Sequence, residues 1–181
     1  MKKKFVYFVM SVSVLISCSS PNGGNDKAKL IASIDSIQKN MFNAKTMQLD
    51  KNLAFKGINA YKDFVKKFPD DSIHSAEYLF RLSDLSRGVG DNRNAILYLG
   101  QITKTYPTFK KIPECIFLQG YYYQEFFADT TSAKIFYNQI IEKYPSHPFA
   151  NDAKELMKMF GKSEADIIKG FEKKEQEGKK K

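Results

Sequence analysis

Apolar side chains recur at helical spacing along nearly the whole chain after Lys27. In the first such stretch they follow one another at i, i+4, i+7 and i+11, on one face of a helix. These residues are Leu30, Ile34, Ile37 and Met41. No stretch of period-2 alternation is long enough to predict a strand. We therefore predict an all-α protein of about eight helices. After the first, the predicted helices cover residues 53–68, 73–87, 92–106, 113–127, 132–144, 149–160 and 165–175.

An aromatic residue followed by proline ends three of these helices in a fixed register. The pairs are Phe68-Pro69, Tyr106-Pro107 and Tyr144-Pro145, and successive prolines are 38 residues apart. Apolar and small residues keep the same distance from each proline. Five residues before it stand Phe64, Ile102 and Ile140; eight before it Tyr61, Leu99 and Tyr137; twelve before it Gly57, Ala95 and Ala133. This register predicts an internal repeat of packed helical hairpins.

The N-terminus has the layout of an export signal. Lys2, Lys3 and Lys4 precede an apolar stretch over residues 5–16, which is too short to span a bilayer as a helix. The sequence Leu15-Ile16-Ser17-Cys18 resembles the bacterial lipobox, which implies cleavage before Cys18 and acylation of that residue. The alternative is an ordinary signal peptide with an incidental cysteine. We expect a signal peptide over 1–17, a lipidated Cys18 with a flexible tether over 18–26, a folded body over 27–176 and a basic tail over 177–181.

The hairpin units resemble the tetratricopeptide repeat (TPR), whose consensus includes W-x2-L-G-x2-Y, A-x3-F and a closing proline. In the clearest unit these positions fall on Ile116, Gln119, Gly120, Tyr123, Ala133, Tyr137 and Pro145. In the preceding unit they fall on Tyr78, Arg81, Leu82, Leu85, Ala95, Leu99 and Pro107. The resemblance covers about residues 50–160 and implies a right-handed TPR-like solenoid, with the helices over 149–175 as a cap.

Together with the lipobox, the repeats are similar to those of the TPR lipoproteins of Gram-negative envelopes. These include BamD-like outer-membrane assembly factors and CpoB/YbgF-like periplasmic proteins. No Asp follows Cys18 directly and no acidic cluster follows it, so we expect the outer membrane, with the protein facing the periplasm. The resemblance implies a non-catalytic scaffold that binds other envelope proteins or peptides. Two other readings stay open: a structural protein that contacts peptidoglycan, and an envelope enzyme with an unrecognised site.

The formal charge of +9 does not predict nucleic-acid binding. Removal of the three lysines of the export segment lowers the net charge to +6, and the remaining positive charges are interleaved with negative ones and do not form a stripe. A surface that follows phosphates needs clustered Lys and Arg. Removal of the signal peptide leaves a chain long enough for one domain with a sizeable core. We expect a mildly basic surface and no nucleic-acid partner.

The sequence predicts no catalytic, metal or cofactor site, and we expect no enzyme and no small-molecule substrate. His74 and His147 lack further ligands at metal-binding spacing and are expected at helix starts or on the surface. Cys115 stands in an apolar helix without a nearby base, so we expect a buried structural thiol. Asp70, Asp71 and Asp91 are expected to be turn and cap residues.

The aromatic run Tyr121-Tyr122-Tyr123 suggests where a partner binds. Successive helical residues point about 100° apart, so the three rings cannot all enter one core. Tyr123 takes the consensus core position, which leaves Tyr121 or Tyr122 displayed. By the register of the repeat, a partner-binding groove is expected at Leu79, Ser83, Arg87, Phe117, Tyr121, Gln124 and Glu125.

Overall fold

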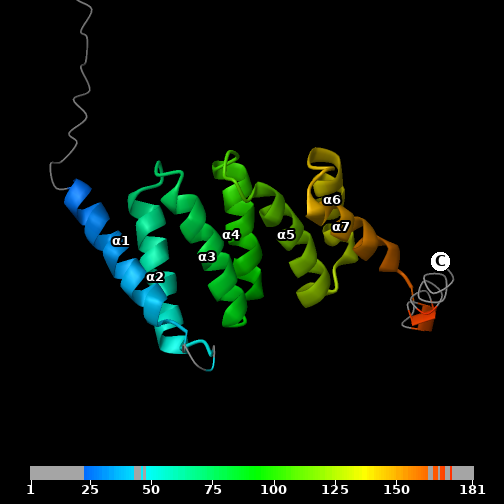
Figure 1. Cartoon of the computed structure of the whole chain (residues 1–181), viewed down its shortest axis with the longest axis horizontal. Coiled ribbons are helices and arrows are strands. Elements are labelled where there is room, and N and C mark those ends of the chain that lie inside the picture. Colours follow the sequence, from blue (N-terminus) through cyan, green and yellow to red (C-terminus); the bar gives the residue numbers. More distant parts are fainter. Residues whose placement is uncertain are drawn as a thin grey trace, which may run out of the picture.

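The computed structural model describes residues 23–42, 46, 48–162, 165–166, 168–169 and 172. Within these residues the structure is helical, apart from turns and one isolated antiparallel bridge between Phe42 and Leu49. Figure 1 shows the helices side by side in a row. They are α1 (Gly23–Asn40), α2 (Lys51–Lys67), α3 (His74–Gly88), α4 (Asn92–Thr105), α5 (Ile112–Phe127), α6 (Thr130–Lys143) and α7 (Pro148–Met159).

Each helix packs mainly against its neighbours in the sequence. The pairs α3–α4 and α5–α6 have the most extensive contacts, followed by α2–α3 and α4–α5. The helix α7 packs on α6 and also reaches α5. This arrangement confirms the prediction of an all-α, TPR-like solenoid, in which each unit is stabilised by the units beside it.

The boundaries of α2, α4 and α6 follow from their end residues. Each begins at an aspartate N-cap whose carboxylate accepts backbone N–H groups of the first turn; these caps are Asp50, Asp91 and Asp129. Each ends at the aromatic residue before proline, with φ between −125° and −135° and ψ between 53° and 61°. Proline disfavours the helical conformation of the residue before it, so the three helices end alike.

The repeated columns of the sequence form the core. The small residues Ala95 and Ala133 are fully buried, as are the large residues that stand eight and five positions before each proline. These large residues are Tyr61, Phe64, Leu99, Ile102, Tyr137 and Ile140, all 2% exposed or less. The predicted repeat register is therefore confirmed.

Gly120 lies at a close contact between α5 and α6. A Cβ atom added to it would lie 2.8 Å and 2.9 Å from ring carbons of Tyr137 and 3.2 Å from the backbone oxygen of Ala133. Contacts under 3.0 Å force a neighbour to move. The consensus glycine is therefore required here for space. Its φ is not in the left-handed region, so backbone conformation is not the reason.

One sequence expectation needs revision, at the start of the solenoid. The helix α1 begins at Gly23, inside the segment expected to be a tether over 18–26. Asp26 stands in its first turn, where a negative charge stabilises the positive end of a helix. The predicted helix over 165–175 lies mostly outside the described residues, and the five residues described within it are helical. Cys18, the lipobox and the tail over 177–181 lie outside the described residues altogether.

Candidate functional site

The structure divides the residues predicted to line the groove into two groups. Leu79 and Ser83 on α3 are each 1% exposed, so neither contacts a partner and both predictions are wrong. The phenol of Tyr122 on α5 lies close to Ser83, so the next hairpin contributes to the burial of Ser83. Arg87, in the last turn of α3, is exposed.

Phe117 is also more deeply buried than the sequence predicted. It is 9% exposed, because Phe149 of α7 stacks on it with ring centroids 4.5 Å apart and planes 6° apart. Tyr137 of α6 approaches it from the other hairpin helix, with 5.7 Å between the ring centroids. Phe117 therefore forms the floor of a surface whose accessible parts are its neighbours.

Tyr121 and His147 extend this stack across α5 and the start of α7, which gives a row of four aromatic side chains. We call them the aromatic ladder: Tyr121, Phe117, Phe149 and His147. Tyr121 is nearly parallel to Phe117 at a centroid distance of 6.3 Å and an angle of 10°. His147 lies 5.3 Å from Phe149. All but Phe117 are half-buried, so each presents part of a ring to solvent while the packing holds it in place.

Polar groups stand beside the ladder on the same helix. Gln124 is committed to the fold, because its side-chain oxygen accepts a hydrogen bond from the Tyr137 hydroxyl at 3.0 Å. Glu125 is exposed and close enough to Tyr137 to affect its pKa. Burial, with smaller contributions from Tyr121 and Glu125, raises the pKa of Tyr137. The Tyr137 phenol is therefore a neutral hydrogen-bond donor at physiological pH.

The tyrosine run differs from its prediction. Tyr122 is the buried member at 2% exposure, whereas Tyr121 and Tyr123 are both half-buried. Burial raises the pKa of Tyr122, and the nearby Arg87 charge opposes that rise. Tyr123 stacks on Phe136 of α6 at 5.6 Å. The consensus assigns core positions within one hairpin, but α5 also packs against helices of the preceding hairpin, and Tyr122 faces that contact.

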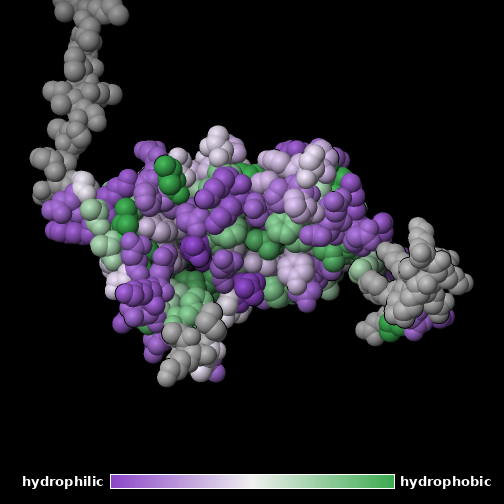
Figure 2. Space-filling view, in the orientation of Figure 1, coloured by the Kyte–Doolittle hydropathy of each residue, from purple (hydrophilic) through white to green (hydrophobic). Residues whose placement is uncertain are grey.

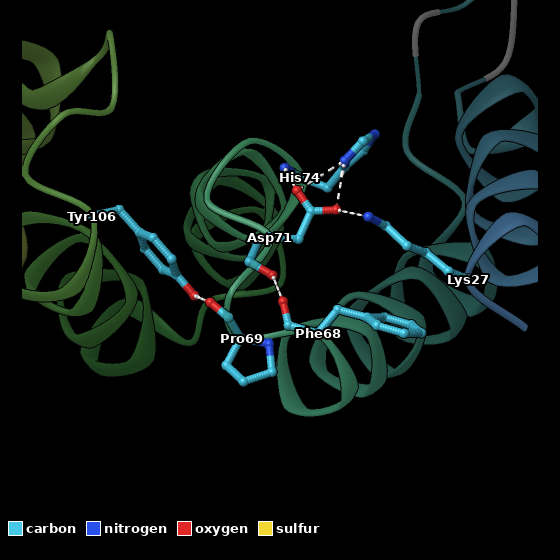
Figure 3. Close-up of polar contacts among 7 residues, drawn as sticks. Lys27, Phe68, Pro69, Asp71, His74 and Tyr106 are labelled. Carbon is cyan, nitrogen blue, oxygen red and sulfur yellow. Dashed lines mark hydrogen bonds and ion pairs between the residues drawn. The ribbon is translucent and has the colours of Figure 1, made fainter. Parts of the chain in front are cut away.

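A polar junction that the sequence did not reveal ties α1 to the turn before α3 (Figure 3). The Asp71 carboxylate accepts a hydrogen bond from Lys27 Nζ at 2.5 Å and lies 2.9 Å from His74 Nδ1. It also accepts the backbone N–H of His74 at 3.0 Å. Burial alone would raise the pKa of Asp71, but the bonds from Lys27 and His74 outweigh it and lower that pKa to about 2.

The same turn is bonded to both of its neighbouring hairpins. The Ser75 hydroxyl donates to the Phe68 carbonyl at 2.7 Å, and the Tyr106 hydroxyl donates to the Pro69 carbonyl at 2.8 Å (Figure 3). The predicted turn role of Asp71 is thus confirmed. Lys27 was missed because it stands 44 residues earlier, and no spacing rule connects the two positions.

The residues considered for chemistry have structural roles. Burial raises the pKa of the Cys115 thiol to about 12, which suppresses the reactive thiolate. This fully buried thiol matches its prediction. His147 accepts the backbone N–H of Phe149 as the N-cap of α7, and His74 is the first residue of α3, both as expected. Among the described residues, no group of three or more His, Cys, Asp or Glu side chains is placed to hold a metal ion.

The hairpin that carries most of the ladder matches a known family. Residues 114–147, from the first turn of α5 to the N-cap of α7, match the family model of the tetratricopeptide repeat. This segment is similar to a tetratricopeptide repeat. No curated protein matches the chain. The TPR consensus positions Gly120, Ala133 and Tyr137 are those that make the close contact between α5 and α6.

A TPR unit indicates a protein–protein interaction module. Figure 2 shows a surface that is mostly hydrophilic in this view, with hydrophobic residues visible between the helices. None of the helices in the described part of the chain combines the length and apolar character needed to cross a membrane. Of the residues predicted to bind a partner, Tyr121, Glu125 and Arg87 are accessible, and Phe149 and His147 join them as residues that the sequence did not suggest.

Proposed function

We propose that this chain is a lipid-anchored, non-catalytic TPR scaffold that binds other cell-envelope proteins through the aromatic ladder. The observation that carries the proposal is the stack of aromatic rings over α5 and α7. The rings of Tyr121, Phe149 and His147 are partly exposed, and their packing holds them in place. Rigid aromatic rings bury a large area at a low cost in conformational entropy, and they anchor many protein interfaces. Glu125 and Arg87 add exposed charges for orientation.

The N-terminal sequence supports the location we propose. The export segment followed by Leu15-Ile16-Ser17-Cys18 is typical of a protein that is acylated at the cysteine. Several acyl chains, each contributing about 0.8 kcal/mol per buried methylene, make such anchoring lasting. We place the protein at the outer membrane, facing the periplasm. Envelope proteins in transit to that membrane, including those of an outer-membrane assembly pathway, are then its accessible partners.

Chemical crosslinking in cells that express single-residue variants tests the proposal. Tyr121→Ala removes the half-exposed ring at one end of the ladder and leaves the buried Phe117 in place. Ile135→Ala is the matched control, because Ile135 is 62% exposed on α6 and outside the ladder. Circular dichroism is used to check that both variants fold.

We expect Tyr121→Ala to reduce the captured yield of partner proteins about tenfold, which is the effect of truncating a residue at the centre of an interface. We expect Ile135→Ala to leave the yield unchanged. Equal yields for both variants would contradict a role for the ladder. Retention of the chain on isolated peptidoglycan sacculi, without any captured protein, would instead support the cell-wall alternative.

A further inference from the structure

A cleft opens in the middle of the described solenoid, between the start of α3 and the connection from α4 to α5. Its volume is about 610 Å³. Its lining combines cationic, apolar and hydroxyl side chains with a single carboxylate. The lining residues are Ser72, Ile73, Glu77, Arg81, Thr108, Phe109, Lys110 and Lys111. None of them belongs to the aromatic ladder.

The only carboxylate of this cleft is already neutralised by its neighbours. Glu77 accepts two hydrogen bonds from Lys111 Nζ, at 3.1 Å and 2.9 Å, and one from Arg81 Nε at 3.1 Å. Burial would raise the pKa of Glu77, but these bonds and charges outweigh it and lower the pKa. Glu77 therefore stays ionised at neutral pH and holds Lys111 and Arg81 in fixed positions.

Positive charge remains available in the cleft after this pairing. Arg81 uses only Nε for Glu77, and its two terminal nitrogens donate no hydrogen bond to other described residues. Lys110 is exposed and forms no ion pair within the described part of the chain. Three cations against one carboxylate leave a net positive site that is ready to accept anionic groups.

Apolar side chains stand directly beside these cations. Ile73 is 76% exposed. Phe109 is half-buried against Phe80, with 6.4 Å between the ring centroids, and the Lys111 ammonium lies 4.5 Å from the Phe80 ring centroid. The cleft therefore presents a hydrophobic contact and a positive charge within the same cavity.

We propose that this cleft binds an acidic peptide segment of another protein that carries a hydrophobic side chain next to its carboxylates. The carboxylates meet Lys110 and Arg81, and the hydrophobic side chain covers Ile73 and Phe109. The chain itself is a poor occupant. Its own net charge, +9 over the whole sequence and +6 without the three lysines of the export segment, opposes a second copy at a positive site. The proposal rests on the protein-binding function proposed above and adds a second contact with its own chemistry.

Fluorescence anisotropy with the purified full-length chain and defined peptides tests the proposal. The first probe is a labelled peptide of about twelve residues that repeats Glu-Glu-Leu. One control peptide replaces Leu with Ser, and another replaces Glu with Lys. The protein variants are Lys110→Glu and Ile73→Ser, both at exposed positions. The matched control variant is Lys56→Glu, an equal charge reversal at an exposed site on α2, outside the cleft.

We expect the acidic, Leu-containing peptide to bind most tightly, with an affinity that falls as salt rises from about 50 to about 300 mM. Reversal of one charge at the edge of the cleft changes the free energy of binding by about 1 kcal/mol or more, so Lys110→Glu weakens binding about fivefold or more. Ile73→Ser weakens it severalfold, and Lys56→Glu leaves it unchanged.

Three results would overturn the proposal: equal binding of the Ser-containing peptide, an equal loss with Lys56→Glu, or no binding at all.

Vesicles that contain phosphatidylglycerol distinguish a lipid site. If Lys110→Glu weakens vesicle binding and not peptide binding, the cleft binds headgroups and not a peptide. Partner capture that depends on Tyr121 while the peptides fail to bind would reject the cleft and leave the scaffold proposal standing. Peptide binding at the cleft without any captured partner would reject the ladder alone.

Discussion

At the scale of single residues, the repeat register predicted buried positions well and exposed positions poorly. The columns of small and large residues counted from each proline are buried, because they lie inside one hairpin and depend only on local spacing. Leu79 and Ser83, which were predicted to line a groove, are each 1% exposed, and Phe117 is only 9% exposed because Phe149 of the next unit stacks on it. Consensus spacing describes one hairpin and does not say how closely the next one packs.

The close contact at Gly120 yields a stability prediction. A Leu side chain there would have to displace the Tyr137 ring, whose carbons would lie within 2.9 Å of its Cβ. Overpacking of a well-packed core typically costs about 1–3 kcal/mol, so we expect Gly120→Leu to lower the free energy of unfolding by that amount. Urea unfolding measures it.

Gly24→Ala is the control, because an added Cβ would meet no atom within 4 Å and alanine favours helix. We expect this variant to be as stable as the original chain or slightly more stable. If Gly120→Leu unfolds at the same urea concentration as the original chain, α5 and α6 do not pack as described.

At the scale of helices, the sequence predicted the elements because their ends carry strong local signals. Aspartate caps and aromatic–proline stops bound α2, α4 and α6 to within a few residues of prediction. The start of α1 was missed, since Gly23 and Gly24 are poor helix formers and gave no signal. The bond between Lys27 and Asp71 was also missed, because it joins positions that only the fold brings together.

This junction predicts how stability depends on pH. The pKa of Asp71 is about 2 in the folded chain, below the ordinary 3.8. Its stabilisation is therefore present above about pH 4 and is lost as the pH falls toward 2. Asp71→Asn keeps an oxygen that can accept the backbone N–H of His74 but removes the charge that pairs with Lys27. We expect it to cost about 1 kcal/mol at pH 7 and much less near pH 2.

Thermal melts at both pH values, for the original chain and the variant, measure this difference. Asp63→Asn serves as a control, because Asp63 lies 3.9 Å from Lys67 in an exposed pair that contributes little. A constant gap between Asp71→Asn and the original chain from pH 7 to pH 2 would show that the charge of Asp71 does not hold α1.

At the scale of the whole molecule, the proposed scaffold combines an anchored N-terminus with a row of helices, each held by its neighbours. The all-α architecture was predictable because proline spacing and helical periodicity extend over most of the chain. The aromatic ladder was predictable only in part: Phe117 and Tyr121 share a face of one helix, whereas Phe149 and His147 come from the next unit. Spacing within a helix cannot reveal a stack between two helices.

Anchoring through Cys18 is the prediction that belongs to the N-terminal sequence. Acylation and cleavage both require the cysteine of a lipobox, so Cys18→Ala should abolish labelling by radioactive palmitate and leave the precursor uncleaved at that site. Gel mobility and membrane fractionation measure both effects. Normal processing of Cys18→Ala, with the original chain free in solution, would show that the protein is not anchored there.

The most direct measurement of the central claim is site-specific photo-crosslinking in living cells. A benzophenone amino acid replaces Tyr121 in the ladder or, as the control, Ile135 on α6, which is more exposed at 62%. We predict a discrete crosslinked partner protein from position 121 and none from position 135. Crosslinks of the same proteins from both positions, or only from position 135, would contradict the claim that the aromatic ladder is the protein-binding surface of this solenoid.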